Sequence, residues 1–112
     1  MAISNTQIET GGNDIFVGPG SAPNDVQEHA VTCMIFCNYS STEDVTLNLY
    51  AVPTGGAVVG NFTQIIKDLV IPRGETLTFD SEKLILSSQD RIRAVASANG
   101  RLTATVSTMR VS

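Results

Sequence analysis

Apolar and polar residues alternate one by one in several short segments of this chain, and Gly, Pro, Asn or Asp residues separate these segments. The side chains of a β-strand point alternately to its two faces, so a period of two indicates strands with one buried face. The clearest segment spans 45–51, where Val, Leu, Leu and Ala alternate with Thr, Asn and Tyr. No long segment carries apolar residues at helical spacing. The pattern therefore predicts an all-β chain.

Turn residues recur about every 8 to 12 positions, which is typical of a sandwich or barrel of short strands. A length of 112 residues is sufficient for one domain with its own core. We therefore expect a single antiparallel immunoglobulin-like β-sandwich of about seven to nine short strands, with an extended N-terminal arm. Residues 1–27, which are rich in Gly, Asn, Pro and Ser, would form the arm with a short edge strand at 15–17. Residues 28–112 would form the sandwich domain.

Further strands are expected within 62–71, 75–80, 84–86, 90–98 and 101–111. Asn99-Gly100, between the last two, is the strongest hairpin signal, because a type I′ turn needs positive φ at both positions. Several alanines of these two strands would point inward, although they are too small to fill a core. Large residues such as Leu49 or Phe79 would then pack opposite them, unless a neighbouring strand or subunit packs closely over this region.

The segment 29–39 is apolar at both odd and even positions. One face would carry Val31, Cys33, Ile35 and Cys37. Met34 and Phe36 would lie on the other face, which in a two-layer sandwich is exposed to water. They therefore indicate a covering loop or a subunit contact. The alternative is a local β-bulge that changes the facing of part of the strand.

Charged residues make up 16% of the chain, and the net charge is −4. So few charges favour a protein that lies against other subunits, although abundant Thr, Ser and Asn residues could cover the surface instead. The basic residues are scattered, whereas a surface that follows a phosphate backbone needs clustered cations, so we expect no nucleic acid partner. No apolar run approaches the roughly 20 residues that span a bilayer, and no signal peptide is recognisable. We expect no membrane partner and synthesis in a cytoplasm.

Residue types that carry catalysis or bind metals are few and dispersed. Cys33 and Cys37 would lie about 13 Å apart on one strand, too far to form a disulfide with each other, and are interpreted as buried free thiols. His29 is the only histidine, and the adjacent Glu28 would point to the opposite face of a strand, which leaves no catalytic pair. Phosphate-loop, dinucleotide and nucleophile-elbow motifs are absent. We expect a protein that is not an enzyme, without cofactor or metal; calcium held between acidic loops is the alternative.

Three stretches of the chain follow one another in a familiar order: "CMIFCNYSSTEDVTLNLYAVPTGG", "IIKDLVIPRGETLTF" and "EKLILSSQDRIRAVASANGRLTATVS". Over residues 28 to 111 this succession resembles small immunoglobulin-like virion proteins of tailed bacteriophages, and "GGNDIFV" is similar to the opening strand of that family. The chain departs from the usual pattern at 88–90, where Ser-Gln-Asp stands in place of a loop with Gly before Asp. The shared motifs are turns and alternating strands, so no catalytic residue carries over.

The resemblance implies a non-enzymatic structural protein of a bacteriophage particle, made in the host bacterial cytoplasm and located in the virion. The expected role is capsid decoration or cement by adhesion to other virion proteins, such as the major capsid protein, and to copies of itself. A tail, neck or baseplate subunit is the first alternative. A carbohydrate- or host-surface-binding module is the second, but sugar sites usually need exposed aromatic residues, and the chain has no Trp and only Tyr39 and Tyr50.

Adhesion would act through the N-terminal arm and exposed strand edges, for example by adding a strand to a neighbouring sheet. The candidate contact residues are Ile3, Ile8, Ile15, Phe16, Val17, Met34 and Phe36. The alternative is that all seven complete the core of the domain itself. If the arm is separate, deleting residues 2–20 leaves a folded β domain that no longer assembles.

Overall fold

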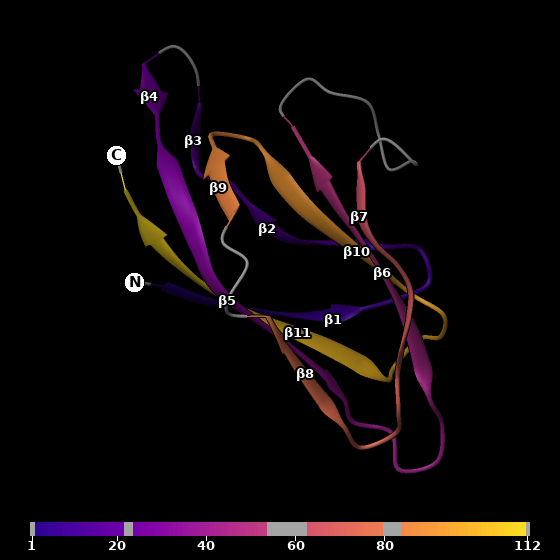
Figure 1. Cartoon of the computed structure of the whole chain (residues 1–112). Coiled ribbons are helices and arrows are strands. Elements are labelled where there is room, and N and C mark those ends of the chain that lie inside the picture. The colour runs from indigo at the N-terminus through magenta and orange to yellow at the C-terminus, as the bar shows by residue number, and fades with distance from the viewer. Residues whose placement is uncertain (1, 22–23, 54–62, 80–83, 112) are drawn as a thin grey trace.

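The computed structural model describes residues 2–21, 24–53, 63–79 and 84–111 (Figure 1). These residues form eleven strands and no helix. The strands are β1 (Ala2–Ile8), β2 (Asn13–Val17), β3 (Gly20–Ser21), β4 (Asp25–Val26), β5 (Glu28–Asn38), β6 (Val45–Val52), β7 (Gln64–Ile71), β8 (Thr76–Phe79), β9 (Leu84–Ser87), β10 (Arg91–Ala96) and β11 (Leu102–Arg110). They assemble into a five-stranded sheet, here sheet A, a four-stranded sheet, here sheet B, and a two-stranded ribbon of β3 and β4. All strand pairs are antiparallel.

The order of strands in the two large sheets follows a nested pattern. Sheet A has the order β1-β11-β5-β8, with β9 also on β5, and sheet B has the order β2-β10-β6-β7. β8 and β9 pair with residues 34–37 and 28–31 of β5, so they act as one interrupted strand. Without the ribbon, and with β8 and β9 taken as one, eight strands remain. The first, β1, pairs with the last, β11; moving inward along the chain, β2 pairs with β10, β5 with β8 and β9, and β6 with β7. Four nested antiparallel pairs folded over into two sheets form a jelly roll.

The expected all-β antiparallel sandwich is confirmed. Its strand order differs from that of an immunoglobulin domain, where the last strand lies at the edge of its sheet. Here the last strand, β11, lies inside sheet A between β1 and β5. Alternation and turn spacing are alike in the two architectures, so only the pairing of distant strands distinguishes them.

The Asn99-Gly100 turn does not close a hairpin, so this prediction was wrong. It connects β10 in sheet B to β11 in sheet A, and these strands do not pair. Gly100 has a φ of 70°, but Asn99 is not among the described residues with positive φ, so the turn is not type I′. Asn99 Oδ1 instead accepts a 2.8 Å hydrogen bond from the backbone N–H of Thr10, which ties the turn to the N-terminal segment.

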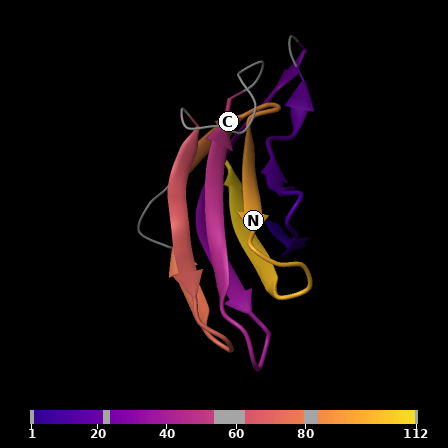
Figure 2. The ribbon, with the colours of Figure 1, turned by 90° about the vertical axis from the view of Figure 1, so that its right-hand side faces the viewer.

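The core lies between sheets A and B; Figure 2 looks onto the strands of sheet B, with sheet A behind them. The predicted alternation holds in β11, where every second residue from Leu102 to Thr108 is buried. Ala104 lies opposite Phe36, and Ala94 lies opposite Leu49. Large side chains therefore fill the space next to the small ones, as expected from the sequence.

A bulge in β5 decides which of its side chains enter the core. Ser107 of β11 lies opposite Cys33, whereas the next residue, Thr108, lies opposite Val31. Thr32 is therefore an extra residue on β5, and the facing of the strand changes at this point. Thr32 Oγ1 donates a 3.0 Å hydrogen bond to the backbone oxygen of Ser107, which fastens the bulge to β11.

The bulge corrects the predicted facing of Met34 and Phe36. Both side chains are in the core, exposed by 4% and 0%, and the Phe36 ring packs edge-on against Phe79 with centroids 5.8 Å apart. Ile35, which a regular strand would have placed with buried Val31, faces outward. The alternative interpretation of a local bulge is therefore the correct one, and neither residue is left to contact another subunit.

The N-terminal segment is part of the sandwich rather than an arm beside it. β1 pairs with β11 along its whole length, and β2 pairs with β10. Ile8 and Ile15 are exposed by only 0% and 1%. The predicted short edge strand is present within β2, but a division into residues 1–27 and 28–112 does not describe this fold. Figure 2 shows the N-terminal strands along one side of the molecule.

Candidate interaction surface

The described residues hold no evident cluster of catalytic or metal-binding side chains. No three His, Cys, Asp or Glu residues among them come together as ligands for a metal ion. His29 Nε2 lies 3.1 Å from Gln27 Oε1, and its ring lies 6.1 Å from that of Phe16. The histidine thus joins β5 to β2 by packing. Within the same residues, no helix could cross a membrane.

The outward side chains of sheet A form a surface that we call the uncharged face. Leu102, Ala104 and Val106 of β11 are buried, so the residues between them point outward, and their partners on neighbouring strands point the same way. The rows across the sheet are Gln7–Thr103–Cys37–Thr76, Asn5–Thr105–Ile35–Thr78, Ile3–Ser107–Cys33 and Met109–Ala30–Ile85. None of these residues carries a charge.

Large apolar side chains are exposed among the hydroxyl and amide groups of this face. Ile3 is exposed by 70%, Ile85 by 64%, Met109 by 44% and Ile35 by 36%. The hydroxyl groups are partly satisfied within the sheet, as where Thr105 Oγ1 bonds to Asn5 Oδ1 at 2.9 Å. Charged residues are depleted at the centre of protein–protein interfaces. The uncharged face shares with such centres its lack of charge and its exposed apolar side chains.

The outer side of sheet B is different, because it carries ion pairs. Asp14 of β2 lies 3.1 Å from Arg93 and 3.8 Å from Arg91, both on β10. Beside them, Tyr50 lies opposite Arg93. The low charge content of the chain is thus unevenly distributed between the two outer sides of the sandwich.

Cys33 and Cys37 both belong to the uncharged face and flank Ile35. They are free thiols, as the sequence predicted, but they are half-buried on the outer side rather than in the core. The bulge at Thr32 accounts for the difference, because it leaves Met34 and Phe36 facing inward.

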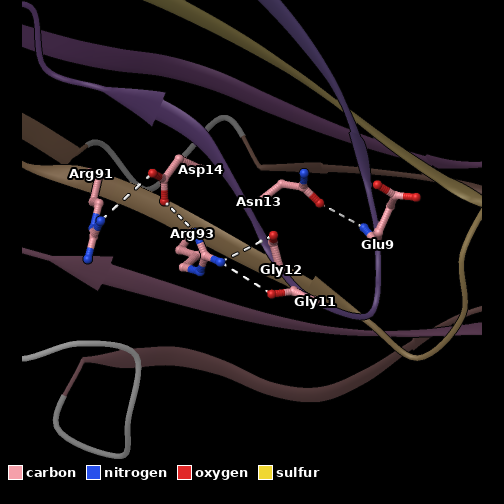
Figure 3. Close-up of polar contacts among 7 residues, drawn as sticks. All are labelled: Glu9, Gly11, Gly12, Asn13, Asp14, Arg91 and Arg93. Carbon is pink, nitrogen blue, oxygen red and sulfur yellow. Dashed lines mark hydrogen bonds and ion pairs between the residues drawn. The ribbon is translucent and has the colours of Figure 1, made fainter.

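The turn from β1 to β2, which carries the chain from sheet A to sheet B, is held by Arg93 (Figure 3). Its Nη2 donates to the carbonyl oxygens of Gly11 and Gly12, both at 3.2 Å, and its Nη1 donates to Asp14 Oδ1 at 3.1 Å. Gly12 has a φ of 84°, and a Cβ there would meet Arg93 Nε at 3.1 Å. A glycine in this conformation lets the guanidinium approach the backbone closely. Arg93 therefore ties the turn that follows β1 to β10.

Replacing Arg93 with Met should lower the free energy of unfolding by about 1–2 kcal/mol, because three charge-assisted hydrogen bonds are lost while the aliphatic part is kept. Urea denaturation measures this loss. Arg91→Met is the matched control, since the contact of Arg91 with Asp14 spans 3.8 Å. It should cost less than about 0.5 kcal/mol. Equal losses would mean that Arg93 acts only as a surface ion pair.

The seven predicted contact residues divide into three groups. Ile8, Ile15, Met34 and Phe36 lie in the core. For these four, the alternative that they complete the domain itself is correct, because buried side chains cannot touch a partner. Phe16 is half-buried and packs against the core. Ile3 and Val17 are exposed, and their contact role stays a prediction.

Most of the uncharged face was missed from the sequence. Alternation with Leu102, Ala104 and Val106 does place Thr103, Thr105 and Ser107 on the face opposite the core. The lack of charge beside them becomes visible only once β1, β5 and β8 are placed next to β11, because their sequences are far apart.

The fold has a weak likeness to one solved structure. No protein-family model matches the chain, and no curated protein sequence matches it significantly. A solved structure of the infectious bursal disease virus Gx strain is similar over 96% of this chain, with a TM-score of 0.42 and 12% sequence identity. The chain spans 29% of that protein's length. A likeness this weak carries no information about function.

Proposed function

We propose that this chain is a non-enzymatic structural protein of a tailed-bacteriophage particle, which decorates or cements the capsid by adhesion to other virion proteins. The observation that carries the proposal is the uncharged face of sheet A. The resemblance of residues 28 to 111 to small virion proteins supplies the kind of particle. The partner that covers the face is another protein of that particle, with the major capsid protein as the first candidate.

The dimensions of the uncharged face suit such a contact. Four strands about 4.8 Å apart and four rows about 6.8 Å apart give a surface of about 500 Å². A stable protein–protein interface buries about 800 Å² on each partner. One face of one copy thus supplies much of an interface, and neighbouring loops or a second copy would complete it.

The chain should be present in purified virus particles. Particles released from cells that carry the gene are banded in a density gradient, and quantitative mass spectrometry measures the amount of this chain relative to the major capsid protein. We expect many copies per particle, with gold-labelled antibody on the capsid surface. Gold label found only on the tail would rule out capsid decoration and support the alternative of a tail or baseplate subunit. Absence from the particles would refute a structural role.

A charge placed in the middle of the uncharged face should prevent attachment. Thr105→Glu would bury an unpaired carboxylate and should weaken binding to particles that lack the chain at least about tenfold, equivalent to about 1.4 kcal/mol. Thr46→Glu is the matched control, because Thr46 also points outward from a central strand, but in sheet B. Co-sedimentation of each purified variant with the particles measures binding. Equal effects of the two substitutions would show that the uncharged face is not the contact.

A further inference from the structure

The four edges of the two large sheets are not equally protected. An edge strand presents unpaired backbone N–H and C=O groups, and proteins protect such edges with charges, bulges or very short strands. β2 carries Asp14 and a register shift near Ile15. β7 carries Lys67 and Asp68, has register shifts against β6, and has a φ of 52° at Asp68. β8 and β9, along the far side of β5, have four residues each.

β1 has none of these protections. It is seven residues long, Ala2–Ile8, and pairs with β11 in an unbroken register. It contains no charged residue, no proline and no glycine. Among the described strands it pairs with β11 alone, so its other side is an open edge. Ile3, Ser4, Asn5 and Gln7 are all exposed along it.

We propose that β1 pairs antiparallel with β1 of a second copy of this chain, about a two-fold axis at Asn5, so that two A sheets become one continuous sheet. This dimer does not rest on the proposed virion role. Full overlap of two strands that each span residues 2–8 requires Asn5 to lie opposite Asn5 of the partner subunit. The contact is then self-complementary, as an interface across a two-fold axis must be.

The side chains of β1 suit this register. On the face of the sheet opposite the uncharged face, Ser4 lies opposite Thr6 of the partner subunit, and hydroxyl pairs of this kind stabilise antiparallel sheets. On the uncharged face, the two Asn5 amides meet, and Ile3 lies opposite Gln7 of the partner subunit. Each copy has a net charge of −4, yet no like charges meet along this edge. A second copy is thus an occupant that the edge accepts without electrostatic repulsion.

The pairing also enlarges the uncharged face. Asn5, Ile3 and Gln7 belong to that face as well as to the edge, so the faces of two copies become continuous across β1. Together they cover about 1,000 Å², twice the area estimated for one copy from strand spacing. This exceeds the roughly 800 Å² that a partner in a stable interface usually contributes.

Charge substitutions at Asn5 test the register directly. In Asn5→Lys, two ammonium groups would meet at the two-fold axis, and in Asn5→Glu two carboxylates would meet. The full chain is studied by sedimentation velocity over a range of micromolar concentrations. We expect the unmodified chain to be a dimer and each variant alone to dissociate at least about tenfold more readily. An equimolar mixture of the two variants should restore the dimer, because the introduced ammonium and carboxylate then pair.

Thr78→Lys and Thr78→Glu are the matched controls. Thr78 is exposed in the same row of the uncharged face, but at the opposite edge of sheet A. These variants should dimerise like the unmodified chain. In the unmodified chain, amide hydrogen exchange within β1 should also slow as concentration rises, a measurement that needs no variant. A monomer at all concentrations, no recovery in the mixture, or equal dissociation by the Thr78 variants would overturn the proposal.

Discussion

Deletion of residues 2–20 is expected to unfold the whole domain. The segment supplies β1 to sheet A and β2 to sheet B, and it contributes Ile8 and Ile15 to the core. Burying one such side chain contributes about 1.5–3 kcal/mol, and the pairing of both strands is lost as well. Domains of this size are stable by only about 5–15 kcal/mol in total. Circular dichroism should show no cooperative thermal transition, and amide proton shifts should lose their dispersion.

Single substitutions separate loss of the strands from loss of their side chains. Ile8→Ala and Ile15→Ala should each cost about 2–5 kcal/mol and leave a folded but weaker domain. Val17→Ala, at a side chain that is 40% exposed, should cost less than about 1 kcal/mol. A sharp unfolding transition in the truncated chain would show instead that residues 28–112 fold alone, as the composition of the N-terminal segment suggested.

Local alternation predicted the strands well, because the facing of side chains is a property of each strand by itself. Alternation alone gives the inward positions of β10 and β11 and most of those of β6, and Leu77 and Phe79 of β8 also pack on the core. At the end of β6 it fails, because Val52 is buried there in place of Ala51, beyond register shifts against β7. Turn residues placed the ends of these strands. A strand was expected within the apolar run 62–71, and β7 confirms it for Gln64–Ile71, within the described residues.

The errors all concern relations between distant parts of the chain. The facing of Met34 depends on Thr32 being extra relative to β11, which no property of 29–39 reveals. The N-terminal strand β1 has mostly polar residues and gains its place from β11, whose residues lie about a hundred positions later in the chain. The uncharged face was missed for the same reason. Its lack of charge is shared by five strands, β1, β5, β8, β9 and β11, and exists only in the assembled sheet.

Replacing Asn38 with Ala is expected to lower the free energy of unfolding by about 2–4 kcal/mol. The side chain is exposed by 0% at the end of β5. Its Nδ2 donates to the carbonyl oxygens of Glu43 at 3.0 Å and Ile71 at 2.9 Å, and its Oδ1 accepts from the Ser40 N–H at 3.0 Å. It therefore connects β5, the following loop and the end of β7. Without it, the buried hydrogen bond to the Ile71 carbonyl and the part-buried bonds with Glu43 and Ser40 are lost, and a cavity remains. Urea denaturation measures the loss.

Asn48→Ala is the matched control, since it removes the same chemical group with a similar set of bonds in a wetter place. Asn48 Oδ1 accepts from Gln64 Nε2 at 2.8 Å and from the Asp68 N–H at 2.9 Å, but the side chain is half-buried on the outer side of sheet B. Water can replace those bonds, so the expected cost is below about 1 kcal/mol. Similar losses in the free energy of unfolding at the two positions would show that burial does not determine how much an asparagine amide stabilises this fold. A larger loss at Asn38 would show that one buried amide holds together the end of the sandwich where β5 and β7 meet the loop before β6.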